Sequence, residues 1–492
     1  MFEIANRETV DCMSPVVTAS RIATLVGEFD RAPAYAGLSD ALRLLIGDGR
    51  IPLGARLPSE RDLTGVLEVS RTTVTRAYAD LRDRGFAEAR QGAGTFTRLP
   101  GGRRATMDRA LAPLPGNPEM IDLNCAAASA PPGIAALYEE AVAELPAYLA
   151  GHGYFPAGLP ELQERIAATY AARGLPTDPD QILVTPGALS ATAIVAQALT
   201  SPGDRILVDS PVYPNATNAL ASRGARLVTS PVDPDGFDLP GMVATVRQSA
   251  PKLAYLIPDF QNPTGHVMTS SEREEYAAAL RRNRVTVVVD EAHQELALDD
   301  IEMPPPFASF LEDTITVGSA SKQFWGGLRL GWIRAPRPRI DAITTGRLGI
   351  DLGAPVMEQL VLARALADPA AVIGAHKERL RIQRDALVAA MRTHLPDWKF
   401  RVPAGGLCLW CELPLPLASR LAADAELRGV TVAPGPVFAV HGGLEHFIRI
   451  PWTRPVDELE AAVRILSATW DETQNAARAS GSGRRSERVR VV

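Results

Sequence analysis

The alternation of two patterns from about residue 123 onward most constrains the fold of this chain. Short apolar runs of strand length alternate there with longer segments of helical periodicity. Strands separated by helices favour a mainly parallel sheet that is covered on both faces, so we predict the α/β class. Sheets of this kind bind ligands at the carboxyl ends of their strands. The seven predicted strands cover residues 182–185, 206–208, 226–228, 254–257, 285–290, 314–317 and 330–333.

The length of 492 residues predicts two or three domains. The net charge is −6, yet the front of the chain is rich in arginine. No apolar run reaches membrane-spanning length and no signal-peptide order is visible, so we expect a cytoplasmic protein. The predicted parts are an N-terminal extension (1–33), a first domain (34–98), a linker rich in Pro, Gly and Arg (99–120), a large domain (121–473) and a disordered basic tail (474–492).

The cysteines are too few for a disulfide framework. Cys408 and Cys411 form a C-x-x-C pair, but the run 407–413 reads as a strand, where positions three apart face opposite sides. We therefore interpret them as buried strand thiols and expect no metal site.

The first domain shows three short helical patterns followed by a ribbon. Ser59 is a plausible N-cap of the second helix and Ser70 of the third, and Gly85 ends the third. Residues 86–96 read as a two-stranded ribbon with residues 91–94 at its tip. This order predicts a winged helix-turn-helix, which places the start of its third helix in the major groove of DNA.

The blocks 57–63, 69–74, 77–78 and 85–86 resemble the DNA-binding domain of GntR-type bacterial regulators. The resemblance implies double-stranded operator DNA as a partner. Arg71 is the candidate for a bidentate contact to guanine, and Thr72 and Thr73 for phosphate or a thymine methyl group. The implied DNA-binding residues are Arg61, Ser70, Arg71, Thr72, Thr73, Gln91 and Gly92.

Lys322 is one of only four lysines, and it ends the run Gly-Ser-Ala-Ser-Lys just before Gly-Leu-Arg-Leu-Gly. A lysine in that setting can carry a Schiff base. The hydroxyl of Ser319 and the guanidinium of Arg329 could bind a phosphate while the amine holds an aldehyde, which is how pyridoxal phosphate (PLP) is anchored.

Other strand ends carry residues that suit the same cofactor. The run 185–189 opens a helix whose backbone N–H groups favour a phosphate. Tyr213 offers an aromatic face for stacking and Asn262 an amide for a phenolate or carboxylate oxygen. Asp290 could pair with a protonated pyridine nitrogen, which would make the ring an electron sink.

In this order, these motifs resemble fold type I PLP enzymes, the aspartate aminotransferase superfamily. The resemblance implies a smaller C-terminal α+β subdomain, a homodimer in which Tyr154 reaches the partner's phosphate, and Arg449 as the ligand of an effector carboxylate. It implies Lys322 as the catalytic residue. The implied cofactor-binding residues are Lys322, Asp290, Asn262, Tyr213, Arg329, Ser319, Ala188, Leu189, Tyr154 and His293.

One residue departs from the related pattern. Where the family usually has tyrosine three positions after the aspartate, with its hydroxyl on the phenolic oxygen of the cofactor, this chain has His293. We expect that an imidazole could still donate that hydrogen bond, but that its charge can change near neutral pH. PLP binding survives this change, whereas catalytic competence is put in doubt.

A winged helix joined to an aminotransferase-like domain resembles the MocR subgroup of GntR regulators. The predicted function is a PLP-dependent transcriptional regulator that senses PLP itself, or an amine or amino-acid effector, through an aldimine at Lys322. Two alternatives stay open. One is a true aminotransferase with an accessory DNA-binding domain, which steady turnover would favour; the other is a regulator that has lost the cofactor.

Overall fold

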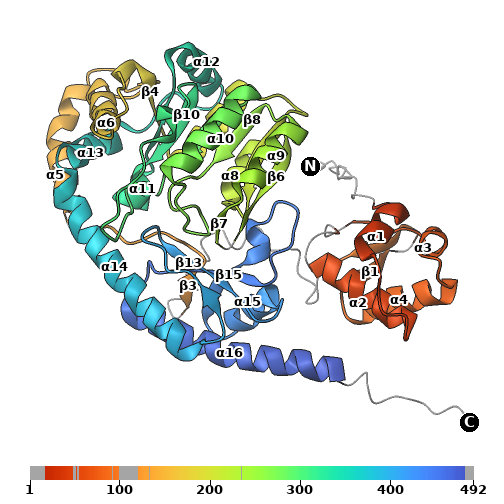
Figure 1. The fold of residues 1–492 in the computed structure, drawn as a ribbon. Coiled ribbons are helices and arrows are strands. Elements are labelled where there is room, and N and C mark those ends of the chain that lie inside the picture. The colour runs from red at the N-terminus through yellow and green to blue at the C-terminus, as the bar shows by residue number, and fades with distance from the viewer. Residues whose placement is uncertain are drawn as a thin grey trace, which may run out of the picture. The chain divides into compact units, whose positions relative to one another are not determined.

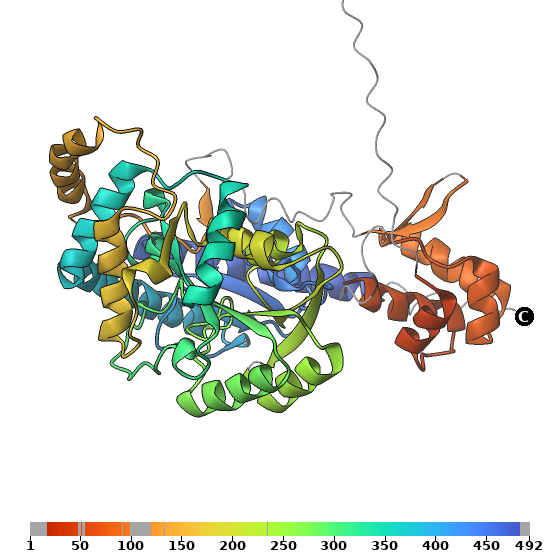
Figure 2. The ribbon, with the colours of Figure 1, turned by 90° about the horizontal axis from the view of Figure 1, so that it is seen from above.

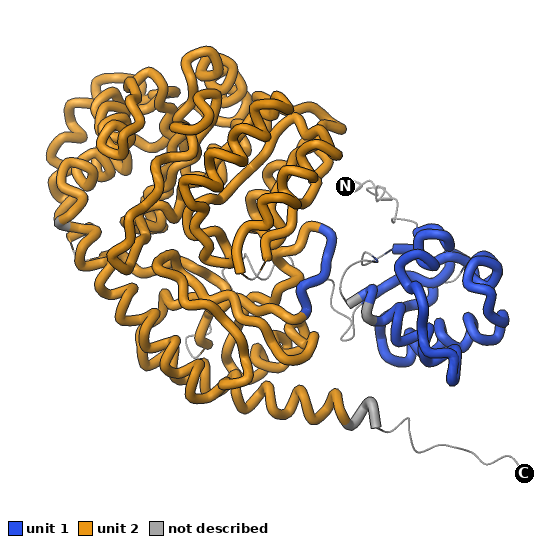
Figure 3. Tube along the Cα trace, viewed as in Figure 1, with its two compact units in different colours: residues 1–109, 441–445 blue, residues 110–440, 446–492 orange. Residues whose placement is uncertain are grey.

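The computed structural model describes residues 17–47, 51, 55–90, 92–98, 120–131, 133–233 and 235–482. Figure 3 shows its two compact units, Met1–Arg109 with His441–Glu445, and Ala110–Val440 with His446–Val492. Gln91, nearly all of the predicted linker and residues 483–492 lie outside the described residues. Among the described residues, no helix is both long and apolar enough to cross a membrane.

The first unit is a helix-turn-helix with a two-stranded wing. Ser59 and Ser70 each accept a hydrogen bond from the backbone N–H of the third residue of the helix that follows. Both predicted N-caps are therefore present. The wing strands pair antiparallel. The elements are α1 (Ala19–Val26), α2 (Ala34–Gly47), α3 (Glu60–Leu67), α4 (Arg71–Asp83), β1 (Ala87–Arg90) and β2 (Gly94–Thr97).

Helix α1 lies ahead of the boundary that we predicted at residue 34. Its buried side chains Ile22 and Val26 belong to the same core as Leu38 and Leu42 of α2. The folded unit therefore starts within the predicted N-terminal extension, because α1 supplies apolar surface that α2 and α3 would otherwise expose.

The large sheet of the second unit contains all seven predicted strands. The order is β4-β11-β10-β9-β8-β5-β6-β7, in which β11 runs antiparallel to both neighbours. The expected mainly parallel sheet is confirmed, and the two-residue strand β7, too short to show periodicity, extends it. The bounds are β4 (Ile182–Thr185), β5 (Arg205–Ser210), β6 (Arg226–Asp233), β7 (Gly236–Phe237), β8 (Leu253–Leu256), β9 (Thr286–Asp290), β10 (Thr314–Ser319) and β11 (Gly331–Arg334).

Helices cover both faces of this sheet. On one face, α7 and α12 pack against every second residue of the strands. On the other face, α9 and α10 pack against the strand residues that alternate with these. Figure 1 shows α9 and α10 in front of the strands, and Figure 2 shows them on the opposite side of the sheet from α7. The bounds are α5 (Ile134–Glu144), α6 (Pro160–Ala172), α7 (Ala188–Leu199), α8 (Pro214–Ala221), α9 (Leu239–Ser249), α10 (Ser270–Arg282), α11 (Ala320–Gln323), α12 (Arg337–Leu348) and α13 (Val356–Ala367).

A smaller sheet forms the predicted α+β subdomain. Its order is β12-β13-β15-β14-β3, and β3 joins it from the start of the second unit. In Figure 1 the long helix α14 runs from the helices beside the large sheet to this smaller one. The bounds are β3 (Ile121–Leu123), α14 (Pro369–His394), β12 (Lys399–Phe400), β13 (Cys408–Glu412), α15 (Ala418–Glu426), β14 (Val430–Pro434), β15 (Phe447–Pro451) and α16 (Val456–Ser482).

Two features of the subdomain bear on the sequence predictions. Cys408 and Cys411 are buried in β13, as expected of strand thiols. Helix α16 continues to Ser482, so residues 474–482 are helical rather than part of a disordered tail. The buried Thr473 donates a 2.9 Å hydrogen bond to Asp424 of α15, which anchors this part of the helix.

Candidate functional site

Lys322 lies in the short helix α11, directly after β10. Ser319 caps this helix by accepting a hydrogen bond from the backbone of Ser321 at 3.2 Å, so both predicted residues belong to one turn. The Lys322 amine donates a 2.8 Å hydrogen bond to the backbone oxygen of Ala126. Burial lowers the pKa of Lys322, which favours the neutral amine that can react with an aldehyde.

Asp290 ends β9 and is buried. Its carboxylate accepts hydrogen bonds from the hydroxyl of Tyr255 and, at 2.8 Å, from the backbone of Ala292. Burial raises the pKa of Asp290, and the Tyr255 hydrogen bond opposes this. A buried carboxylate of this kind gains a partner when a protonated pyridine nitrogen approaches it.

Tyr255 was not among the residues predicted from the sequence. It lies in β8, where it reads as an ordinary strand residue. The register of β8 and β9 pairs Tyr255 with Val288, two positions before Asp290, so both side chains face the same side of the sheet. A prediction that β8 pairs with β9 would have identified Tyr255 as a neighbour of Asp290.

The structure corrects our expectation for His293. Its Nδ1 lies 3.1 Å from the backbone oxygen of Phe260. A carbonyl oxygen only accepts, so Nδ1 carries the proton and Nε2 is the acceptor in the neutral ring. Burial, reinforced by the charges of Lys322 and Arg449, lowers the pKa of His293 to about 4. The imidazole is therefore neutral near pH 7, and its Nε2 accepts rather than donates.

Arg449 reaches the site from β15. Its guanidinium donates to Oδ1 of Asn262 at 3.4 Å and to the backbone oxygen of Asn124, and it lies 4.8 Å from the centre of the Phe438 ring. The third nitrogen, Nε, is buried and has no partner among the described residues. A buried guanidinium with an unmet donor suits a carboxylate.

The amino end of α7 is open for an anion. Gly187 precedes this helix without a side-chain cap, so the first N–H groups, including those of Ala188 and Leu189, stay available. The guanidinium of Arg329 borders the same turn. A side-chain Cβ at Gly187 would lie 3.1 Å from Nη2 of Arg329, so glycine leaves the space between them clear.

Two tyrosines were predicted to contact the cofactor. Tyr213 precedes α8 and is half-buried, and its hydroxyl accepts a 2.9 Å hydrogen bond from Asn215. Burial raises the pKa of Tyr213. The charges of Asp290 and Arg449 also act on Tyr213, so it lies in the electrostatic environment of the candidate site. Tyr154 is 58% exposed and stacks on His152 in its own loop.

These residues fit a phosphorylated pyridine aldehyde. Lys322 offers the amine, Asp290 the charge for a ring nitrogen, and the α7 terminus with Arg329 the phosphate site. The unmet Nε of Arg449 offers a second anion site for a carboxylate.

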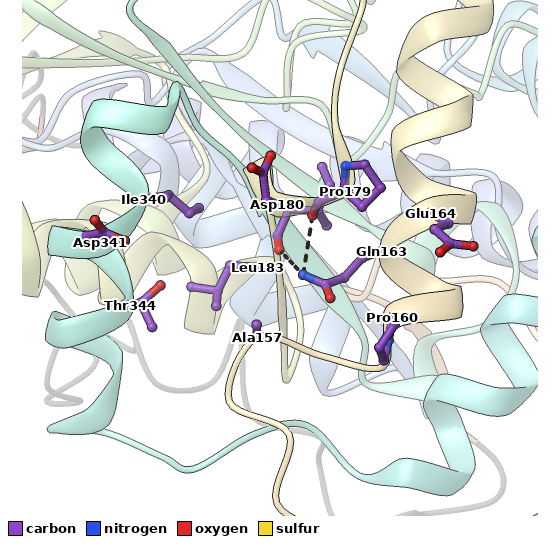
Figure 4. Close-up of a pocket in the computed structure, with 11 residues that line it drawn as sticks. Ala157, Pro160, Gln163, Glu164, Pro179, Asp180, Leu183, Ile340, Asp341 and Thr344 are labelled. Atoms are coloured by element: carbon purple, nitrogen blue, oxygen red, sulfur yellow. Dashed lines mark hydrogen bonds between the residues drawn. The ribbon is translucent and has the colours of Figure 1, made fainter.

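A cavity of about 360 Å³ lies elsewhere in the second unit. Figure 4 shows it between α6 and α12, at the amino end of β4, where Gln163 donates hydrogen bonds to the backbone of Pro179 and Ile182. The site residues follow the carboxyl ends of the strands instead. The acidic groups of this cavity are Glu164, Asp180 and Asp341, which disfavour a phosphate.

The predicted DNA-contacting residues lie in the first turn of α3, at the start of α4 and at the wing. Arg71 opens α4 with a side chain that is 79% exposed and an ion pair of 3.7 Å to Glu60. Ser70 caps α4 through the backbone of Thr73 at 3.0 Å. The exposed residues of this group are Arg61, Ser70, Arg71, Thr72 and Gly92, while Thr73 is half-buried.

Two family models match the chain. The model for aminotransferase class I and II matches residues 140–466, and the model for bacterial regulatory proteins of the gntR family matches residues 34–97. The first covers most of the α/β unit, and the second coincides with the winged helix.

Relatives and solved structures agree with these matches. The chain is 26% identical to the uncharacterized HTH-type transcriptional regulator YdfD of Bacillus subtilis, over 86% of this chain and 93% of the relative. It is 28% identical to the probable rhizopine catabolism regulatory protein MocR of Rhizobium meliloti, over 74% and 78%. The structure of LysN, an alpha-aminoadipate aminotransferase of Thermus thermophilus, matches with a TM-score of 0.68 and 25% identity, over 76% of this chain and 96% of LysN. The chain belongs to the aminotransferase class I and II family and carries a gntR-type domain at its front, the architecture of regulators such as MocR.

Proposed function

We propose that this MocR-type regulator reads the state of Lys322 and changes its hold on operator DNA accordingly. The aminotransferase fold implies pyridoxal 5'-phosphate as the cofactor. When bound, this cofactor supplies an aldehyde that condenses with a primary amine. Lys322 holds the cofactor, Asp290 orients its ring, and Arg329 with the α7 terminus binds its phosphate.

One observation carries the proposal. Residues 124–130, which we term the entry segment, accept hydrogen bonds from both ligand-binding groups: Asn124 from Arg449, and Ala126 from Lys322. The aldehyde of the cofactor competes with the Ala126 oxygen for the Lys322 amine, and the carboxylate of an effector competes with the Asn124 oxygen for Arg449. Occupation of the site therefore favours an arrangement in which the entry segment has moved.

The entry segment follows β3, and β3 follows the chain that leads from the winged helix. It is further held by Arg379, which donates to the backbone oxygen of Ser129 at 2.7 Å, and by Thr453, which donates to that of Cys125 at 3.2 Å. Because the entry segment is held at several points, displacing it would also shift the residues that precede it in the chain. Such a shift gives a ligand different affinities for two domain arrangements, which allosteric coupling requires.

The effector class is an amine that carries a carboxylate. Arg449 supports the carboxylate through its unmet Nε, and Lys322 supports the amine because an effector amine can take its place on the aldehyde of the cofactor. The similar LysN structure holds N-(5'-phosphopyridoxyl)-L-leucine, an amino acid joined to the cofactor. The cofactor alone remains the second candidate signal, because it too removes the Lys322 hydrogen bond to Ala126.

A homodimer completes the proposal. Apolar residues are exposed around the loop of Tyr154 and at the end of α12, and a Cβ at Gly353 would meet the backbone of Phe155, so the two loops lie together. Burying this surface against a second copy would stabilise both. Ile350→Asp should convert the dimer to a monomer, as measured by light scattering. The control is Leu427→Asp, at an exposed leucine of the smaller subdomain, which should stay dimeric. An unchanged mass for both variants would refute this interface. The exposed set is Leu149, Tyr154, Leu348, Ile350 and Leu352.

An aminotransferase with an accessory DNA-binding domain is the second candidate. It is favoured by the presence of Lys322, Asp290 and Arg449 in one site. The acceptor role of His293 argues against it, since the enzyme pattern provides a donor there.

A gel-shift titration tests the proposal directly. The full-length protein is titrated against its own upstream DNA, with and without PLP and a panel of amino acids, while the visible absorption is followed. We expect one ligand to change the absorption and the DNA affinity at the same concentrations. Turnover of an amino acid and a keto acid at ordinary enzyme rates, with DNA affinity unchanged, would reject regulation in favour of catalysis.

A further inference from the structure

His293 places a hydrogen-bond acceptor near Asn262, at a position where the enzyme pattern has a second donor. We propose that the two side chains hold the 3'-oxygen of the cofactor as a neutral hydroxyl, with Asn262 as its donor and His293 as its acceptor. This inference rests on the cofactor site of the proposed function and adds to it the protonation state of the bound ligand.

The acceptor side follows from the tautomer of His293. Its Nδ1 proton is committed to the backbone oxygen of Phe260 at 3.1 Å. The ring is 6% exposed, and Lys322 and Arg449 are the cations that act on it. A second proton would place a positive charge on a buried ring that already lies near the guanidinium of Arg449, so Nε2 keeps its lone pair.

The donor side follows from the contact between Arg449 and Asn262. A guanidinium only donates, so the Asn262 oxygen must face Arg449, which it does at 3.4 Å. This fixes the amide orientation and leaves the Nδ2 group as the part of Asn262 that can address a ligand. Asn262 and Phe260 belong to one loop, and His293 bonds that loop, so both side chains border the same part of the site.

A hydroxyl matches this pair, whereas a phenolate does not. A hydroxyl accepts from Nδ2 of Asn262 and donates to Nε2 of His293, which satisfies both groups. A phenolate would place its lone pairs against the lone pair of Nε2 and would leave a buried acceptor without a donor. Arg449 and Arg329 favour the anion, but Arg449 already donates to two oxygens and Arg329 is exposed, which weakens their effect.

Absorption of the PLP-loaded, full-length protein at neutral pH tests the inference. The hydroxyl form absorbs in the near ultraviolet, and the phenolate form in the visible. We expect wild type to show mainly the near-ultraviolet band. His293→Tyr, which restores a second donor, should invert the ratio of the bands, and His293→Gln, whose amide can also donate, should shift it the same way. The matched control is His446→Tyr, which should keep the wild-type ratio of the bands. Nδ1 of His446 also lies 3.1 Å from a backbone oxygen, that of Leu413, but His446 lies outside the site.

Borohydride reduction and peptide mass analysis separate this inference from the proposed function. An adduct on Lys322 combined with a mainly visible band in wild type would overturn the neutral hydroxyl and leave the cofactor site intact. The absence of any adduct on wild-type Lys322 would overturn both.

Discussion

The amine of Lys322 and the backbone oxygen of Ala126 form a hydrogen bond of 2.8 Å across 196 positions of sequence. Ala126 lies two residues beyond Asn124, which accepts from Arg449. The entry segment therefore occupies in the free protein the two groups that the aldehyde of the cofactor and the carboxylate of an effector would use. Occupation of the site and the position of this segment are linked through these contacts.

Replacing Arg449 should separate recognition of the carboxylate from recognition of the cofactor. Lysine cannot reproduce the planar guanidinium, so Arg449→Lys should weaken binding of an amino-acid effector about 10- to 100-fold, the loss of a charge-assisted pair. PLP affinity should change little, because Arg449 does not serve the phosphate. Calorimetric titration measures both. Arg428→Lys, at an exposed ion pair with Glu472, is the control and should bind both ligands as wild type does.

Removing the hydroxyl of Tyr255 should weaken PLP binding about tenfold or more. The hydroxyl stabilises ionised Asp290, and its loss raises the pKa of that carboxyl further, so the carboxylate pairs less well with a ring nitrogen. Equilibrium dialysis of Tyr255→Phe measures the affinity. Tyr276→Phe is the matched control, since Tyr276 is equally buried but its hydroxyl has no partner among the described residues. Equal PLP affinity in the two variants would refute the role of Tyr255.

The sequence predicted the residues that follow strand ends better than it predicted their partners. Lys322, Asp290 and Asn262 stand in motifs whose position in an α/β fold is determined by local order. The acceptor role of His293 could not be predicted, because its proton is fixed by Phe260, 33 positions earlier on another loop. The contact between Lys322 and Ala126 is of the same kind, since it depends on tertiary packing between distant segments.

The stability of the second unit should depend on pH through Asp209. Burial raises the pKa of Asp209 to about 7, and its Oδ2 has no partner among the described residues. The folded state then holds a proton that the unfolded state has lost, so stability falls as pH rises from about 4 to about 7 and stays low above that. Asp209→Asn should stabilise the protein by about 4 kcal/mol at pH 8 and by less at pH 5. Urea unfolding at the two pH values measures this, and an equal gain at both would contradict the assignment.

Shortening Arg71 should reduce DNA affinity and relax sequence preference together. Its exposed side chain opens α4, so Arg71→Ala should cost about 1–3 kcal/mol against the preferred operator and less against a variant with one guanine replaced. Competitive gel shifts measure the two affinities. Arg82→Ala, in the last turn of α4, is the control and should retain the preference. A uniform loss across all sequences would mean that Arg71 binds phosphate instead.

Domain boundaries were less predictable than motifs. Residues 1–33 were predicted to be an extension outside the first domain. Ile22 and Val26 of α1 nevertheless complete the core of the first unit. The polar end of α16 resembled a tail, but Thr473 and the ion pair between Glu472 and Arg428 tie it to the subdomain. In both places, burial against a distant element outweighs local composition.

The response of DNA binding to ligands in Lys322→Ala tests the central claim most directly. The variant loses the amine that holds PLP and also the hydrogen bond to the entry segment, so its DNA affinity should no longer change with PLP or amino acids, while affinity without ligand stays measurable. Lys399→Ala, at a side chain that is 80% exposed, should respond as wild type does. A Lys322→Ala protein whose DNA affinity still shifts with the same ligands at the same concentrations would contradict the account.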